Sequence, residues 1–156
     1  MYKELTEGAE APDFEATTDG GNSLQLSSLK GNFVVLYFYP KDDTPGCTKE
    51  SCSFAENYGY FSSKGAEIIG VSKDSVARHD KFKAKYNLPF TLVSDEDGTI
   101  CEAYGVWKEK KNYGRTYMGI ERSTFLIDKH GKVAKAWRKV KVNGHIEAVK
   151  KVLDEF

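Results

Sequence analysis

The chain has 156 residues, a length that suits one domain around a single core, and we expect residues 1–156 to form that domain. Its 23 basic and 23 acidic residues are mixed along the chain, so no basic field favours nucleic acid or an anionic membrane as a partner. No uncharged apolar stretch of about 18 residues predicts a membrane span, and the first residues lack a signal-peptide pattern. Three cysteines are too few for a disulfide framework, so we expect a cytoplasmic protein with catalytic or buried thiols.

Two apolar runs rich in β-branched and aromatic residues predict the centre of the fold. Phe33–Tyr39 and Ala66–Val71 each have the pattern of a strand buried on both faces, and a helix with two cysteines lies between them. Strand, helix and strand over about 40 residues form a right-handed βαβ unit in a parallel sheet. This unit predicts a three-layer α/β core. Residues 1–30 are less defined and can add an N-terminal hairpin around Phe14 and Leu24.

Helical and extended patterns alternate after the second buried strand. Ser75–Tyr86 predicts a surface helix, residues 91–93 a short strand, and residues 97–104 a short helix. The Lys-rich, Tyr-rich segment Val106–Met118 has neither pattern. We expect a loop there, packed on the body of the protein, with apolar surface near the functional site as the alternative.

The last third of the chain predicts two strands and a helix. Ile120–Ile127 and Lys132–Val140 flank a tight polar turn and predict an antiparallel hairpin. Apolar residues at helical spacing after Asn143 predict a final helix that packs one face on the sheet. With the central βαβ unit, this order predicts a thioredoxin-like fold of three α/β/α layers, with a mixed central sheet and the added N-terminal hairpin.

The segment Tyr39–Cys52 carries the chemistry. Thr44-Pro45-Gly46 opens a helix directly after a buried strand, which places Cys47 at the positive end of the helix dipole and favours its thiolate. A free cysteine is usually a small buried hydrophobe, but the Thr-Pro-Gly sequence just before Cys47 argues against that interpretation. A thiolate that meets a peroxide becomes a sulfenic acid, which a second thiol can convert into a disulfide.

Cys52 is the available second thiol, five residues after Cys47. In an intact α-helix their Cα atoms would be roughly 8 to 9 Å apart on divergent faces. A disulfide tolerates at most about 7 Å. The pair therefore either never bonds or bonds after the first helical turns unwind.

Pro40, Thr44 and Cys47 fit the pattern PxxxTxxC, and in this signature the chain resembles the peroxiredoxins. The wording TPGCTKESC narrows the likeness to the peroxiredoxin Q group, also called bacterioferritin comigratory proteins. Ala11–Phe14 resembles the N-terminal segment of the family and Gly119–Asp128 its late strand, so the resemblance covers nearly the whole chain.

The resemblance implies a role for each matched residue. Cys47 would attack the peroxide and Cys52, on the same helix, would resolve the sulfenic acid. The Thr44 hydroxyl, the backbone N–H groups near Cys47 and the Arg122 guanidinium would stabilise the charge on the leaving oxygen, and Pro40 would shape and shield the pocket. The simpler alternatives are a helix cap for Thr44, an exposed strand arginine for Arg122 and a strand terminator for Pro40.

No cofactor is predicted. The cysteines are five and 49 residues apart with no histidine at ligand spacing beside them, which argues against a metal site. Neither GxGxxG nor GxxxxGK is present, which argues against a nucleotide. Cys101, beside Ile100, is expected in the core, with an alternative disulfide as the less favoured interpretation.

We therefore predict an antioxidant thiol peroxidase that reduces hydrogen peroxide and alkyl hydroperoxides and is recycled by thioredoxin or a similar dithiol protein. The family group also implies a monomer. One alternative is a general thiol-disulfide oxidoreductase, although the compact CxxC spacing is absent. Another is a peroxide sensor or holdase whose oxidation exposes Phe54, Tyr58 and Phe61 to a partner.

Overall fold

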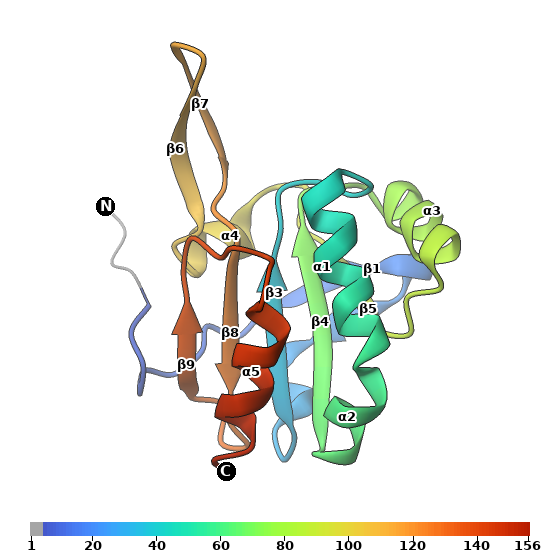
Figure 1. Ribbon diagram of the computed structural model, residues 1–156, viewed down its shortest axis with the longest axis vertical. Helices are drawn as coiled ribbons and strands as arrows, with labels where there is room; N and C mark the ends of the chain where they lie inside the picture. The colour runs from blue at the N-terminus through green and yellow to red at the C-terminus, as the bar shows by residue number, and fades with distance from the viewer. Residues whose placement is uncertain (1–4) are drawn as a thin grey trace.

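A seven-stranded mixed sheet forms the centre of the computed structural model, which describes residues 5–156 (Figure 1). The strand order is β2-β1-β5-β4-β3-β8-β9. These strands are β1 Glu15–Thr18, β2 Ser23–Gln25, β3 Phe33–Phe38, β4 Ala66–Ser72, β5 Thr91–Ser94, β8 Ser123–Ile127 and β9 Val133–Trp137. The helices are α1 Pro45–Glu56, α2 Tyr58–Ser63, α3 Val76–Tyr86, α4 Thr99–Ala103 and α5 His145–Leu153, with 3-10 turns at Asp19–Gly21 and Leu26–Leu29.

The predicted βαβ unit is confirmed, with β3 and β4 parallel and central in the sheet. All six residues of β3 are buried, because helices or chain segments cover both faces of the sheet. Val35 and Tyr37 pack in a cluster with residues of α1, α2 and α5. Val34 and Leu36 pack on the opposite face, in a cluster with residues of α4. The side-chain alternation of one strand thus builds two separate cores.

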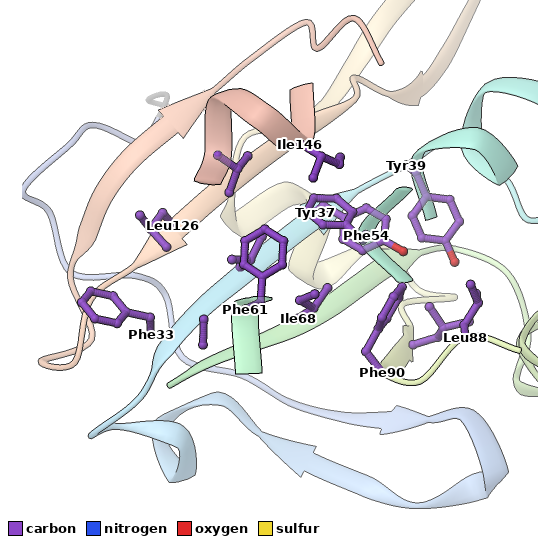
Figure 2. Packing of buried hydrophobic residues seen from close by; sticks show 14 of the residues in the cluster. Phe33, Tyr37, Tyr39, Phe54, Phe61, Ile68, Leu88, Phe90, Leu126 and Ile146 are labelled. Carbon is purple, nitrogen blue, oxygen red and sulfur yellow. The ribbon is translucent and has the colours of Figure 1, made fainter. Parts of the chain in front are cut away.

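The first of these cores supports the helix that carries the two cysteines. Figure 2 shows the Tyr37 ring of β3 beside Phe54 of α1, with Phe61 of α2 and Ile146 of α5 nearby. The Tyr37 and Phe54 rings are stacked with centroids 4.7 Å apart. An offset stack of this kind adds about 0.5–1.5 kcal/mol to the effect of burial. The C-terminal half of α1 is therefore fixed to the sheet by aromatic packing.

The predicted N-terminal hairpin is also confirmed, within the described part of residues 1–30. Strands β1 and β2 pair antiparallel, with Ala16 opposite Leu24. Strand β1 also pairs antiparallel with β5, so the hairpin extends the main sheet at one edge. Phe14 lies just before β1 and packs, partly buried, against the core on the α4 face.

The expectation of a loop at Val106–Met118 is wrong. Strands β6 (Trp107–Asn112) and β7 (Arg115–Ile120) pair antiparallel as a separate ribbon that projects from the end of the body at which α1 begins (Figure 1). Its two turn residues, Tyr113 and Gly114, both have positive φ, 51° and 76°. That geometry matches the twist of a two-residue hairpin. The ribbon is largely exposed, so no apolar alternation marked it in the sequence.

Three boundaries near the C-terminus also differ from the sequence-based expectation. Ile120 belongs to β7, so the strand predicted at Ile120–Ile127 begins at Ser123, and Arg122 lies in the connection between β7 and β8. The β8–β9 hairpin is confirmed, but β9 ends at Trp137. The final helix begins at His145, because Gly144 precedes it with a φ of 77°.

Candidate active site

Cys47 lies in the first turn of α1 and is 1% exposed. The helix begins at Pro45, whose fixed φ suits this position, after Thr44 in extended conformation. The first backbone bond of the helix runs from Thr48 N–H to the Thr44 carbonyl, 2.8 Å. The Thr44 hydroxyl does not cap the helix but donates to the Lys41 carbonyl at 2.9 Å. The simple-cap interpretation of Thr44 is therefore wrong in this structure, and the side chain instead tightens the loop before Cys47.

Arg122 contacts Cys47, although the two residues are 75 positions apart in the sequence. Its Nη2 donates to Cys47 Sγ at 3.4 Å, and its Nη1 donates to Glu50 Oε1 at 2.7 Å. The side chain is 17% exposed, so the interpretation of Arg122 as an exposed strand residue is also wrong. The planar guanidinium contacts a thiol and a carboxylate at once, which a lysine could not do with the same geometry.

Gly46 makes room for this arrangement. A Cβ built on Gly46 would lie 3.2 Å from Arg122 Nη2, closer than an ordinary van der Waals contact. Any side chain at this position would push against the guanidinium that contacts Cys47. The glycine in the TPGC motif therefore sets the distance between the arginine and the start of α1.

Glu50 is a site residue that the sequence reasoning missed. It is fully buried, Oε2 has no hydrogen-bond partner among the described residues, and Oε1 accepts from Arg122. Burial raises the pKa of Glu50 to about 7, although the Arg122 charge acts in the opposite direction. A signal was present, because Glu50 follows Cys47 by three residues and so lies on the same face of the helix. The carboxylate orients the arginine that serves the thiol.

Cys52 lies half-buried on the same unbroken helix, and both cysteines are free thiols. Burial and the Glu56 carboxylate raise the pKa of the Cys52 thiol. The helix is continuous from Pro45 to Glu56, so residues five apart cannot form a disulfide without unwinding. Between the two cysteines, Ser51 is fully buried and its Oγ lies 2.8 Å from the Tyr37 hydroxyl.

Cys101 lies on the opposite face of the sheet from Cys47. It is fully buried in the core cluster of α4, whereas Cys47 belongs to the cluster of α1. Its backbone N–H donates to Asp95 Oδ2 at 2.9 Å, and burial raises the pKa of its thiol. A Cys47–Cys101 disulfide would have to cross the sheet, which argues for the core interpretation.

His145 is a second buried titratable group near the arginine. Its Nε2 lies 2.7 Å from Thr124 Oγ1, and its ring packs edge-on against Trp137 and Phe54. Burial, together with the Arg122 charge, lowers the pKa of His145 to about 4. The imidazole is therefore neutral at physiological pH and adds no second positive charge beside the guanidinium.

A buried polar network anchors the loop before Cys47 to α3. Asp42 Oδ2 lies 2.6 Å from His79 Nδ1, Asp42 Oδ1 accepts from the Tyr39 hydroxyl at 2.6 Å, and the Asp42 N–H donates to Asp74 Oδ2 at 2.9 Å. The sequence placed His79 on a charged surface helix, but the residue is fully buried. Asp42, Asp74 and His79 form the one trio with metal-ligand geometry in residues 5–156. Asp74 also accepts hydrogen bonds from Ser72 and Arg78, so the network has partners within the chain.

Pro40 lies at the bend after β3 and is exposed. Its predicted role in shielding the pocket stays a prediction.

Comparison with known proteins places this geometry in a family. The family model described as "AhpC/TSA family" matches residues 8–136. The chain is 55% identical over 148 residues to "Peroxiredoxin Bcp" of Bacillus subtilis, covering 94% of each chain. The chain belongs to the AhpC/TSA family of peroxiredoxins.

Solved peroxiredoxin structures share the whole architecture. A mutant of Xylella fastidiosa PrxQ superimposes with a TM-score of 0.93 at 40% identity, covering 99% of this chain and 98% of that one. The Xanthomonas campestris bacterioferritin comigratory protein superimposes with a TM-score of 0.90 at 46% identity, covering 96% and 98%. The resemblance to the Q group and the thioredoxin-like fold are thus confirmed, and this peroxiredoxin is a thiol peroxidase. No helix within residues 5–156 is long and apolar enough to cross a membrane.

Proposed function

We propose that this peroxiredoxin reduces hydrogen peroxide and organic hydroperoxides with Cys47 as the attacking thiolate and Cys52 as the resolving thiol. The observation that carries the proposal is the contact of Arg122 Nη2 with Cys47 Sγ, 3.4 Å, backed by the buried Glu50 carboxylate. The Xanthomonas campestris relative is described by its alkyl peroxide reduction activity, which supports the same class of substrate here.

In the first step the Cys47 thiolate attacks the terminal oxygen of ROOH. An S–O bond forms, the O–O bond breaks, and its electron pair leaves on RO⁻, which takes up a proton to become ROH. Arg122 and the first backbone N–H groups of α1, which have no acceptor within the helix, donate to the oxygens on which negative charge develops. Thr44 lies three residues before Cys47, and its hydroxyl, which donates to the Lys41 carbonyl in this structure, would turn to donate to the peroxide.

In the second step the Cys52 thiolate attacks Cys47 Sγ, the S–OH bond breaks, and hydroxide leaves as water after protonation. The first turns of α1 must unwind for this step, because the intact helix keeps the two cysteines apart. A dithiol protein then reduces the disulfide by thiol-disulfide exchange, and thioredoxin is the donor that we propose.

Residues 1–156 act as a single domain and a monomer in this proposal. Cys47, Glu50, Cys52 and Arg122 all come from one chain, so no second copy is needed to complete the site. A catalyst that must return to the dithiol form in each cycle requires a reducing compartment, which supports the cytoplasm.

The test is to add one equivalent of hydrogen peroxide to the reduced protein, quench with an alkylating agent and identify the modified cysteines by mass spectrometry. We expect a rapid Cys47–Cys52 disulfide, a single turnover in Cys52→Ser, and no peroxide consumption in Cys47→Ser. Cys101→Ser is the matched control and should turn over normally. Multiple turnovers by Cys47→Ser would overturn the scheme. A persistent sulfenate in the unmutated protein, or a bond to Cys101, would remove Cys52 from its role.

A further inference from the structure

An open hollow of about 440 Å³ lies beside Arg122, under the β6–β7 ribbon. Its lining includes five cationic side chains, Lys108, Lys110, Lys111, Arg122 and Lys139, against two carboxylates, Glu109 and Glu121. The chain as a whole has no net charge, so this concentration of positive charge is local. Tyr117 and Val140 add apolar surface to the lining.

Lys110 lines this hollow from strand β6 of the ribbon. Lys110 is opposite Tyr117 and Lys108 is opposite Gly119, so these four residues share one face of the two-stranded sheet. Gly119 leaves that face open: a Cβ there would lie 3.3 Å from Lys110 Cδ and 3.4 Å from the Tyr117 ring. The stem of Lys110 thus rests on the backbone at Gly119.

The Lys110 ammonium is within electrostatic reach of the reaction centre. Burial and the Arg122 charge lower the pKa of Lys110, while Cys47 and Glu121 oppose the change. Within residues 5–156 no close ion pair of Lys110 is seen, and Glu50, the acidic residue that contacts Arg122, is fully buried. Lys110 and Arg122 thus both line one open hollow, in which cationic side chains outnumber the carboxylates of Glu109 and Glu121.

We propose that this hollow binds the carboxylate of an anionic organic hydroperoxide and that Lys110 makes the enzyme prefer such substrates to neutral hydroperoxides of the same size. Arg122 lines the hollow and also contacts Cys47 Sγ at 3.4 Å, so one guanidinium links the hollow to the sulfur. In the proposal, the carboxylate of the substrate lies in the hollow and its peroxide group extends past Arg122 to Cys47. Tyr117 and Val140 would contact the carbon chain between the two groups. This inference rests on the proposed peroxidase function and names the substrate class that the same site selects.

The experiment uses a matched pair of substrates, 6-hydroperoxyhexanoic acid and its primary amide, which differ only in charge. Stopped-flow tryptophan fluorescence gives the second-order rate constant for oxidation of the reduced full-length protein, with no donor protein present. We expect the acid to react faster than the amide at low ionic strength. Lys110→Gln should reduce the acid-to-amide ratio by about twofold to fivefold, a range typical of one partly exposed charge pair. Salt should reduce the ratio in the unmutated protein.

The controls separate this inference from the proposed function. Lys81→Gln removes an exposed lysine of α3, outside the hollow, and should leave the ratio unchanged. Lys110→Arg should restore it. If hydrogen peroxide and both organic substrates fail to oxidise Cys47, the proposed function is wrong. A normal rate with hydrogen peroxide but a ratio that Lys110→Gln leaves unchanged overturns only the substrate preference. In a separate turnover assay with a dithiol donor, an effect of Lys110→Gln on the reduction step alone would assign the lysine to donor docking and likewise overturn the inference.

Discussion

The Tyr37 hydroxyl of β3 lies 2.8 Å from Ser51 Oγ, in the part of α1 that separates the two cysteines. Both side chains are fully buried. Glu50, the neighbour of Ser51, is held in the same way by Arg122. Unwinding α1 to join Cys47 and Cys52 would therefore pull two buried polar residues from their partners. In the proposed mechanism, the stability of the reduced helix sets part of the barrier to forming the Cys47–Cys52 disulfide.

Tyr37→Phe tests that relationship without changing the sequence of α1. The variant removes a buried hydrogen bond of about 1 kcal/mol from the intact-helix state, so the disulfide should form about fivefold faster after oxidation. The reaction is followed by quenching and mass spectrometry at increasing times. Tyr39→Phe is the control, because that hydroxyl bonds to Asp42 in the loop rather than to α1. Equal rates of disulfide formation in the two variants would show that the Tyr37–Ser51 contact does not limit the unwinding of α1.

Glu50 gives the enzyme an unusual dependence of stability on pH. The folded protein holds the Glu50 proton up to about pH 7, whereas the unfolded chain releases it near 4.5. Unfolding therefore releases a proton between these values, and the free energy of unfolding from this group falls as the pH rises from about 4.5 to 7. Glu50→Gln should flatten that slope in urea unfolding of the reduced protein. The exposed Glu56→Gln is the control, and an unaltered slope in Glu50→Gln would contradict the assignment.

The Asp42–His79 pair also makes the stability depend on pH, here through a histidine. Burial lowers the pKa of His79, but the hydrogen bond and charge of Asp42 outweigh burial and raise it above 6.5. The pair therefore stabilises the fold fully below pH 6.5, and its contribution is lost as the pH rises through the folded value. Asp42→Asn should destabilise the protein by about 3 kcal/mol at pH 6, since it leaves one partner of a buried pair unmatched, and by less at pH 9. Chemical unfolding at the two pH values measures both losses.

Asp43→Asn is the adjacent control for this experiment. Asp43 is exposed and pairs with Lys85 on the surface, so its substitution should change stability by less than about 1 kcal/mol. Similar losses at pH 6 and pH 9 in Asp42→Asn would show that the pair contributes through shape rather than charge.

Gly46→Ala tests the spacing between Arg122 and the helix start. The added Cβ would meet Arg122 Nη2 at 3.2 Å and displace the guanidinium from Cys47. We expect oxidation of Cys47 by hydrogen peroxide to slow about tenfold, which corresponds to about 1.4 kcal/mol of lost transition-state stabilisation. The control is Gly59→Ala in α2, where nothing lies within 4 Å of the added atom. A rate within twofold of the unmutated protein would mean that the arginine tolerates the shift.

The sequence predicted the central strands and the position of Cys47 in the first turn of a helix, because both signals are local. The apolar run of β3 and the Thr-Pro-Gly approach to Cys47 lie within one short segment. The β6–β7 ribbon escaped prediction because its strands are mostly polar and exposed, so period-two alternation is absent. Its turn also has a positive φ at Tyr113, and tyrosine is not a residue type from which a hairpin turn is predicted.

The burial of Glu50, Asp42 and His79 could not be predicted from a local pattern, for a different reason. A glutamate or histidine on a helix is ordinarily placed in solvent, and its burial is tolerated only beside a suitable partner. For Glu50 that partner, Arg122, is 72 residues away, and for Asp42 it is His79, 37 residues away. Such pairs become visible only when the topology brings the elements together. Arg122 itself was identified through the family resemblance.

The position of Cys101 on the far side of the sheet gives the protein an internal reporter of global opening. Its thiol is fully buried in the core cluster of α4 and lies away from α1, the helix that unwinds in the proposed mechanism. Alkylation of Cys101 in the native protein should therefore follow the slow opening of the entire domain, while Cys52 is labelled through local fluctuation of α1. One pulse-labelling experiment on the reduced enzyme can thus time both motions in the same molecule, with no probe added.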